Sequence, residues 1–188
     1  LLSGALEPSN APYALAKITG IEMCKAYRAQ YGCDFISAMP CNLYGPGDNF
    51  DLQSAHVIPA LMAKAHAAKV AGDKVLSVWG SGKPRREFLY SDDLTAALLV
   101  LLERYSDSNP VNIGTGEDIT IAALAAEIMH AIDFDGALEF DDKKPDGVFE
   151  KRLDTQVIKA LGWEPVTSLQ DGLARLYDWY RAAYINRS

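Results

Sequence analysis

Apolar positions recur along this chain with two spacings, one typical of amphipathic helices and one typical of short buried strands. The helical spacing predicts helices over about 12–31, 55–70, 92–105, 121–132 and 169–180, with a small helix at 154–162. Short apolar runs predict strands at 35–39, 75–80, 87–90, 110–114 and 137–141. Because strands and helices alternate along the chain, the fold class is α/β.

Local signals mark where several of these elements begin and end. Gly32 is expected to end the first helix, and Ser91 and Thr120 are expected to cap two later ones. Ser168 and Asp171 have the spacing of a capping box before the last helix. The run from Asn42 to Gly47 is expected to be a loop after the first strand, where ligands bind in open α/β sheets.

The organisation indicates the C-terminal part of a doubly wound Rossmann-type sheet and a smaller mixed α/β substrate-binding lobe. Residues 1–50 are expected to end a dinucleotide-binding domain, and 51–188 to be mostly the lobe, with about 85–115 returning to the first domain. The G-x-G at 114–116 lacks the rest of a phosphate loop and is followed by two acids, so we interpret it as a strand-to-helix turn. The chain opens in a loop without an initiator Met, and we expect it to be the C-terminal portion of a longer protein.

Composition excludes several classes of function. The net charge of −7 argues against nucleic-acid binding through a basic surface, and no apolar run reaches the length needed to cross a bilayer. Cys24, Cys33 and Cys41 contain no C-x-x-C pair, which argues against a zinc site or a disulfide framework and favours a cytoplasmic protein without a metal.

Tyr13 and Lys17 are the first candidates for chemistry. They lie four residues apart in a predicted helix, so their side chains share one face. A phenol with a pKa of about 10 exchanges protons poorly at neutral pH, and a neighbouring ammonium lowers that pKa. The pair therefore suits reduction of a carbonyl, although a half-buried tyrosine covered by a lysine would have the same spacing.

Several motifs then follow in order along the chain. They are Pro12-Tyr13-x-x-x-Lys17, Pro40-Cys41-Asn42-Leu43-Tyr44-Gly45-Pro46, Trp79-Gly80-x-Gly82-x-x-x-Arg86-Glu87-Phe88 with Asp92-Asp93, Asn112-x-Gly114-x-Gly116, and Lys144-Pro145-Asp146-Gly147. Over essentially the whole chain this set resembles the extended short-chain dehydrogenase/reductase family of nucleotide-sugar enzymes. The His-Val-Ile-Pro block and Trp-Gly-Ser-Gly are similar to members that epimerise C3 and C5 of GDP-4-keto-6-deoxymannose and then reduce C4.

The resemblance implies an NADP(H) site and an acid–base apparatus. Tyr13 would give a proton to the C4 oxygen, and Lys17 would hold the nicotinamide ribose and lower the tyrosine pKa. The cofactor-facing set would be Lys17, His56 and the loop residues Pro40, Cys41, Asn42 and Leu43. His56 would also serve as an acid in the epimerisation, whereas a lone histidine at a helix start is otherwise a structural hydrogen-bonding group. The family's epimerisation base is a thiol upstream of these residues, and none of the three cysteines matches it.

The resemblance also implies a GDP-sugar substrate. Trp79, Arg86 and Asp146 match the residues that hold the sugar nucleotide, and Lys64 stands where the family has an arginine. The alternative is a core tryptophan and a solvated arginine in a turn. Arg85 is expected to be solvated, and the acids at 92 and 93 to be helix-start charges.

The family pairs two subunits through the helix that carries Tyr-x-x-x-Lys, so a homodimer is expected, with Ile21, Cys24 and Tyr31 as an apolar element of the interface. We expect the 188 residues alone to be inactive. Two other functions stay open: a sugar-nucleotide-binding or dimerisation module without catalysis, and a sister 4-epimerase or 4,6-dehydratase acting on another nucleotide sugar.

Overall fold

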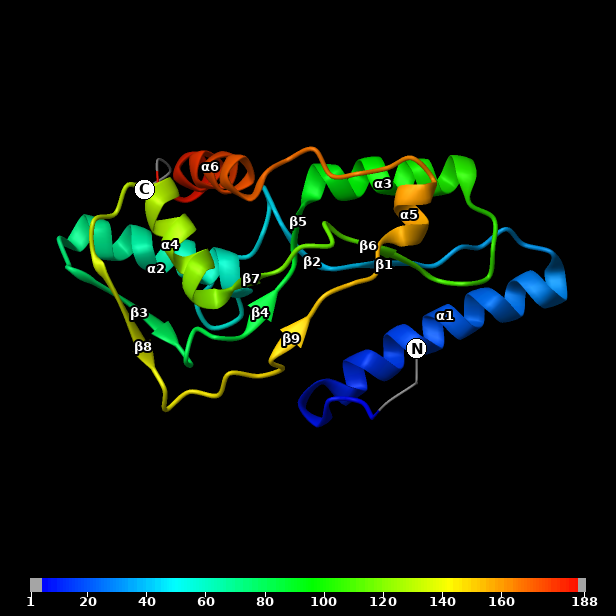
Figure 1. Cartoon of the computed structure of the whole chain (residues 1–188), viewed down its shortest axis with the longest axis horizontal. Helices are drawn as coiled ribbons and strands as arrows, with labels where there is room; N and C mark the ends of the chain where they lie inside the picture. Colours follow the sequence, from blue (N-terminus) through cyan, green and yellow to red (C-terminus); the bar gives the residue numbers. More distant parts are fainter. Residues whose placement is uncertain (1–4, 186–188) are drawn as a thin grey trace.

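Short parallel strand pairs and the helices packed on them form the α/β fold of residues 5–185, the part of the chain that the computed structural model describes (Figure 1). The helices are α1 (Ala11–Tyr31), α2 (Val57–Ala71), α3 (Ser91–Arg104), α4 (Ile121–Ile132), α5 (Gln156–Ala160) and α6 (Leu169–Tyr180), with short helical turns η1 (Pro8–Asn10) and η2 (Arg181–Ile185). The strands are β1 (Ala38–Pro40), β2 (Asn42–Tyr44), β3 (Val75–Trp79), β4 (Arg85–Arg86), β5 (Phe88–Tyr90), β6 (Val111–Ile113), β7 (Ile119–Thr120), β8 (Ala137–Asp141) and β9 (Glu150–Lys151).

The strands pair mostly in parallel. β1 pairs with β6, β2 with β5 and β3 with β8, while β4 lies between antiparallel β7 and parallel β9. The Cys41 N–H donates to the Ile113 carbonyl at 2.9 Å, so the chain passes from the β6 pairing to the β5 pairing without a gap. Parallel pairing requires the long helical crossovers that the sequence supplies between these strands.

Two hydrophobic cores lie in the two groups of elements seen at left and right in Figure 1. The larger core is built mainly by α2, β3, α4 and α6, with Met62, Ile128 and Leu173 fully buried. The smaller core is built by β5, α3, β6 and α5, around Leu101 and Ile113. The strand β2 and the connected β4–β5 segment run between the two groups.

Most predicted element ends are confirmed. Gly32 follows α1 in the left-handed region with φ 67°, Thr120 Oγ1 accepts from the Ala123 N–H at 3.1 Å, and Ser168 Oγ accepts from the Asp171 N–H at 3.1 Å. The prediction for Ser91 was wrong. Ser91 is the first residue of α3 and makes no capping bond, because strand β5 runs straight into the helix.

Two predictions about the first strands were also wrong. Asn42 to Tyr44 form β2 and not a loop, because they find a parallel partner in β5, far along the chain. Phe35 lies outside the first strand and 48% of its surface is exposed. The predicted turn before β5 also contains a strand, since Arg85 and Arg86 pair with β7 and β9.

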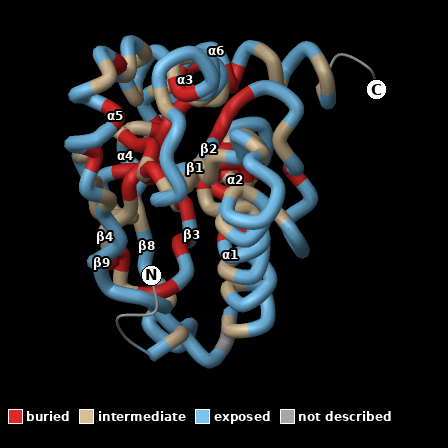
Figure 2. The backbone as a smooth tube through the Cα atoms, turned by 90° about the vertical axis from the view of Figure 1, so that its right-hand side faces the viewer, coloured by how far each residue is buried: buried red, intermediate tan, exposed pale blue. Residues whose placement is uncertain are grey.

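Helix α1 is mostly exposed, as Figure 2 shows. Ile21 is its one buried side chain, Cys24 is half-buried and Tyr31 is exposed. Its C-terminal end is held through Arg28, which donates to the Asp34 carboxylate and to Ser106 Oγ. Across residues 5–185, we find no helix whose length and apolar character would let it span a membrane.

Candidate functional site

Tyr13 and Lys17 project from the exposed first half of α1. The Lys17 ammonium lies 5.4 Å from the centre of the Tyr13 ring, so the two side chains do share a face of the helix. Tyr13 is 60% exposed, which excludes a tyrosine buried in packing. Within residues 5–185, the hydroxyl makes no hydrogen bond and is therefore open to a ligand.

The predicted cofactor-facing residues after β1 divide into two kinds. Pro40 and Leu43 are exposed, and the side-chain amide of Asn42 donates to the Glu87 carbonyl at 2.8 Å. The Cys41 thiol is instead buried in the smaller core, and this burial raises its pKa to about 12. The Cys41 side chain therefore belongs to the packing, and its backbone is the part that can face a ligand.

His56 occupies the N-cap position of α2 and is exposed. Its ring accepts no capping bond, although its carbonyl accepts from the Ala60 N–H at 2.9 Å. The imidazole is therefore free of the structural role that a histidine at a helix start usually has. Helix α2 also carries Lys64, so one helix links the predicted acid to the predicted substrate site.

The candidate substrate site is built around Trp79 at the end of β3. Its indole is 61% exposed, which excludes a core tryptophan. The Lys64 ammonium lies 4.5 Å from the indole centre and the Lys144 ammonium lies 5.1 Å from it. Partial burial lowers the pKa of Lys64. Two cations from different elements therefore share one exposed aromatic surface.

Asp146 fixes the loop that carries Lys144. Its carboxylate accepts from the Ser81 N–H and from the Ser81 hydroxyl, both at 2.7 Å, and these bonds lower its pKa. Gly80 permits this approach, because a Cβ there would lie 2.4 Å from Asp146 Oδ1. The structure thus brings Asp146 beside Trp79 with both carboxylate oxygens already bonded to the chain.

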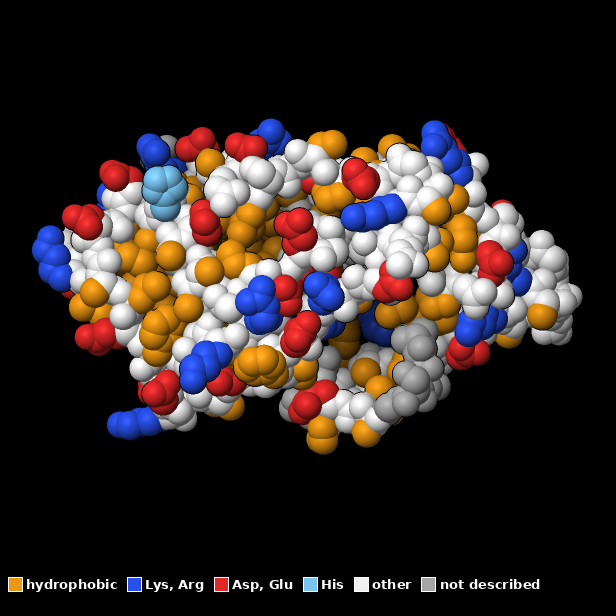
Figure 3. All heavy atoms as spheres, viewed as in Figure 1, with side chains coloured by type: hydrophobic (Ala, Val, Ile, Leu, Met, Phe, Trp, Pro, Cys, Tyr) orange, Lys and Arg blue, Asp and Glu red, His pale blue; other side chains and the backbone are white. Residues whose placement is uncertain are grey.

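Arg86 and Arg85 lie next to each other in β4 but have different surroundings. The Arg86 guanidinium is half-buried, donates to the Arg85 carbonyl at 2.7 Å and has a lowered pKa because of burial. Arg85 keeps 39% of its side-chain surface exposed, and it also donates to the carbonyl and the carboxylate of Asp118, both at 2.9 Å. That antiparallel contact with β7 could not be seen from the local sequence. Figure 3 shows Lys and Arg atoms gathered over β4 and β9, beside a hollow in this face.

Glu87 is the residue that the sequence analysis missed. It is completely buried, and its two carboxylate oxygens accept from the Gly116 N–H at 2.8 Å and the Leu153 N–H at 2.9 Å. A Cβ at Gly114 would lie 2.0 Å from Glu87 Oε1, so that glycine leaves room for the carboxylate. The available signal was an acid directly before the apolar run that forms β5. Glu87 thereby joins the β4–β5 segment to the turn after β6 and to the chain after β9.

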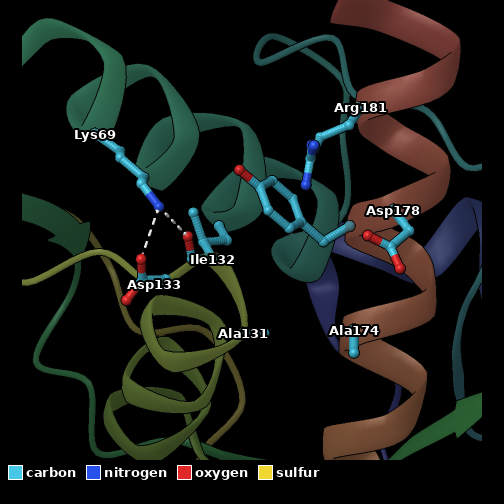
Figure 4. Close-up of a pocket in the computed structure, with 8 residues that line it drawn as sticks. Lys69, Ala131, Ile132, Asp133, Ala174, Asp178 and Arg181 are labelled. Carbon is cyan, nitrogen blue, oxygen red and sulfur yellow. Dashed lines mark hydrogen bonds and ion pairs between the residues drawn. The ribbon is translucent and has the colours of Figure 1, made fainter.

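The described surface includes two hollows lined by charged side chains. One, of about 400 Å³, adjoins the Trp79 site and is lined by Ser81, Lys83, Phe140, Asp142, Lys144 and Asp146. The other, of about 470 Å³, lies between α2, α4 and α6 (Figure 4). There Lys69 donates to the Ile132 carbonyl at 2.8 Å and to Asp133, so the chain itself satisfies that ammonium. We find no cluster of potential metal ligands within residues 5–185.

Comparison with known proteins gives one family and a consistent set of relatives. Residues 1–114 match the model of the NAD dependent epimerase/dehydratase family. The chain is 53% identical over 178 residues to a GDP-L-fucose synthase of Sinorhizobium fredii, covering 95% of this chain and 57% of that protein. It is 51% identical over 187 residues to GDP-L-fucose synthase 1 of Arabidopsis thaliana, covering 100% and 58%.

A solved structure agrees with these relatives. The crystal structure of a GDP-L-fucose synthetase from Naegleria fowleri bound to NADP superposes with a TM-score of 0.91 at 32% identity, over 98% of this chain and 60% of that one. The chain therefore spans a little more than half the length of the relatives that it matches.

Proposed function

The chain belongs to the NAD dependent epimerase/dehydratase family, and on that premise we propose that it supplies the substrate site and part of the catalytic site of a GDP-L-fucose synthase. The complete enzyme would convert GDP-4-keto-6-deoxymannose to GDP-L-fucose with NADPH. The identity of about half of all aligned positions to two such synthases supports this reaction. The observation that carries the proposal is the exposed Tyr13 side chain with the Lys17 ammonium 5.4 Å from the centre of its ring.

The residues fit a nicotinamide nucleotide. Lys17 is exposed and can donate to ribose hydroxyls. Pro40, at the carboxyl end of β1, and Leu43, in β2, are also exposed. NADPH, when bound, supplies a hydride to C4 of the sugar. Tyr13 then donates its proton to the C4 oxygen, and the Lys17 charge favours the phenolate that remains. The products of this step would be the C4 alcohol, NADP⁺ and a tyrosinate, which solvent reprotonates.

Epimerisation precedes reduction in this proposal. The C4 ketone acidifies the C–H bonds at C3 and C5, so a base can remove each proton and an acid can return it on the opposite face. His56 is exposed at the start of α2 and is free to act as that acid. The base would come from residues outside this chain.

Three substitutions in the complete enzyme test these roles. Tyr13→Phe is expected to lower the rate of NADPH oxidation at least about a hundredfold, because the proton donor is lost. It should leave solvent deuterium uptake at C3 and C5 intact, whereas His56→Asn should slow that uptake. Tyr27→Phe, on the exposed part of the same helix, is the matched control. If the wild-type enzyme takes up no deuterium at C3 or C5, the synthase assignment is wrong and a sister 4-epimerase or dehydratase replaces it.

A second function, a sugar-nucleotide-binding module, is favoured by one observation. The Trp79 site, with Lys64, Lys144 and Asp146, is formed entirely by residues of this chain. We expect the isolated 188 residues to be inactive, and calorimetry with GDP and with NADPH would identify a module if GDP alone binds. Turnover of the GDP-sugar by the isolated chain would contradict the expectation of inactivity.

The proposal extends to the domain assignment, the subunit pairing and the cellular location. We propose that the smaller core belongs to the dinucleotide-binding domain and the larger core to the substrate lobe. A homodimer through α1 is supported by its exposed apolar side chains Leu15, Met23 and Tyr31. The free state of all three cysteines supports a cytoplasmic location.

A further inference from the structure

The two ammonium groups at Trp79 have no acidic partner in the part of the chain that the structure describes. Neither Lys64 nor Lys144 forms an ion pair there, although both lie within the distance at which a cation is attracted to an aromatic ring. Two like charges beside one ring repel each other. An anion placed between them would therefore be bound by both.

Backbone hydrogen bonds set the position of Lys144. Trp79 and Asp141 are paired residues of β3 and β8, and the Gly80 N–H donates to the Asp141 carbonyl at 3.0 Å. The Lys144 N–H closes a turn on that same carbonyl, also at 3.0 Å. Two residues after Lys144, the Asp146 carboxylate binds Ser81 and so holds the loop against the start of the β3–β4 connection.

The same loop continues to Arg86. Arg86 Nη1 lies 3.5 Å from the Phe149 carbonyl, and a Cβ at Gly147 would lie 3.8 Å from Arg86 Nη2. One loop thus connects the exposed indole to the half-buried guanidinium. The adjoining hollow is lined by both signs of charge, Lys83 and Lys144 with Asp142 and Asp146, whereas the Trp79 indole is approached by two cations. The Trp79 side of the loop is therefore the more favourable side for an anion.

We propose that Lys144 is a substrate-binding residue that contacts the diphosphate of the nucleotide sugar beside the Trp79 indole, together with Lys64. This inference rests on the proposed function for the identity of the substrate, and it adds a residue to the site. A nucleoside diphosphate has the two features that the site can hold, a flat ring system for the indole and phosphate oxygens for the ammonium groups.

The test uses the complete enzyme with Lys144→Gln and the matched control Lys143→Gln. Lys143 is the exposed neighbour with the same charge, and it is not among the cations near Trp79. Lys144→Gln is expected to raise the KM for the GDP-sugar and the calorimetric Kd for GDP about tenfold, because one charged hydrogen-bonding group is lost. The kcat and the Kd for NADPH should not change. The dependence of GDP affinity on salt concentration should become shallower, as expected when a cation–phosphate contact is removed.

Trp79 provides a second measurement. GDP should change the part of the tryptophan fluorescence that Trp79→Phe removes, and Lys144→Gln should shift the GDP concentration needed for that change. If Lys144→Gln binds GDP as tightly as Lys143→Gln does, the inference is wrong even where the enzyme makes GDP-L-fucose. If Lys144→Gln weakens GDP binding but the wild type does not turn over the GDP-4-keto sugar, the inference holds and the proposed reaction is wrong. If the wild type does not bind GDP, both are wrong.

Discussion

The buried carboxylate of Glu87 leads to a quantitative prediction about stability. Glu87→Gln keeps the shape of the side chain but replaces one acceptor oxygen by an amide NH₂. The amide oxygen can accept from either the Gly116 N–H or the Leu153 N–H, and the NH₂ then faces the other donor. One buried backbone N–H therefore loses its partner.

The magnitude follows from that single loss. An unsatisfied buried donor costs about 1–3 kcal/mol, and the lower cost of burying a neutral amide offsets part of this. We therefore expect Glu87→Gln to lower the free energy of unfolding by about 2 kcal/mol. Glu87→Ala removes both acceptors, and we expect it to lower the free energy of unfolding by about 3–5 kcal/mol.

Urea unfolding measures both changes in the free energy of unfolding. If the dependence of that free energy on urea concentration keeps the same slope, stability alone has changed. Glu117→Gln is the control, because Glu117 is an exposed acid in the turn that Glu87 binds. It should change stability by less than about 0.5 kcal/mol. The reasoning is refuted if Glu87→Gln is as stable as Glu117→Gln, because the two backbone donors would then not depend on the carboxylate.

Two further predictions concern reactivity and pH. Burial raises the pKa of Cys41 to about 12, so almost none of this thiol is ionised at neutral pH. Iodoacetamide should therefore alkylate the half-buried Cys24 and Cys33 first, as measured by peptide mass spectrometry of the native protein. Equal alkylation rates at all three cysteines would contradict the burial of Cys41. The hydrogen bonds from Ser81 lower the pKa of Asp146 below its ordinary 3.8. The Asp146–Ser81 contact is therefore complete above pH 3.8, and it is lost as the pH falls through the lower pKa that Asp146 has in the folded protein. Trp79 fluorescence should therefore change with a midpoint below pH 3.8, and Asp146→Asn should abolish the transition.

Features that depend on neighbouring residues could be predicted from the sequence. Gly32, Thr120 and Ser168 end or begin helices through contacts within four residues, and all three predictions are confirmed. The strand at Asn42–Tyr44 was missed because its partner β5 lies far along the chain. The partner of Arg85 could not be predicted for the same reason, since Asp118 reaches it only through the pairing of β4 with β7.

In the candidate site, too, contacts between near neighbours could be predicted and contacts between distant segments could not. The i, i+4 spacing was sufficient to bring Tyr13 and Lys17 together, and the resemblance was sufficient to group Lys64 with Trp79. Glu87 could not be predicted, because its two backbone donors come from segments that the sequence alone does not bring near it.

The long parallel pairings have a consequence for how the chain folds. In each of the pairs β1–β6, β2–β5 and β3–β8 the partners lie more than 40 residues apart along the chain. Because such distant contacts close large loops before they stabilise anything, topology of this kind slows folding. During synthesis, β1 cannot pair with β6 until Val111–Ile113 has left the ribosome. In that interval the edge of β1 that β6 later covers is open to association with other chains.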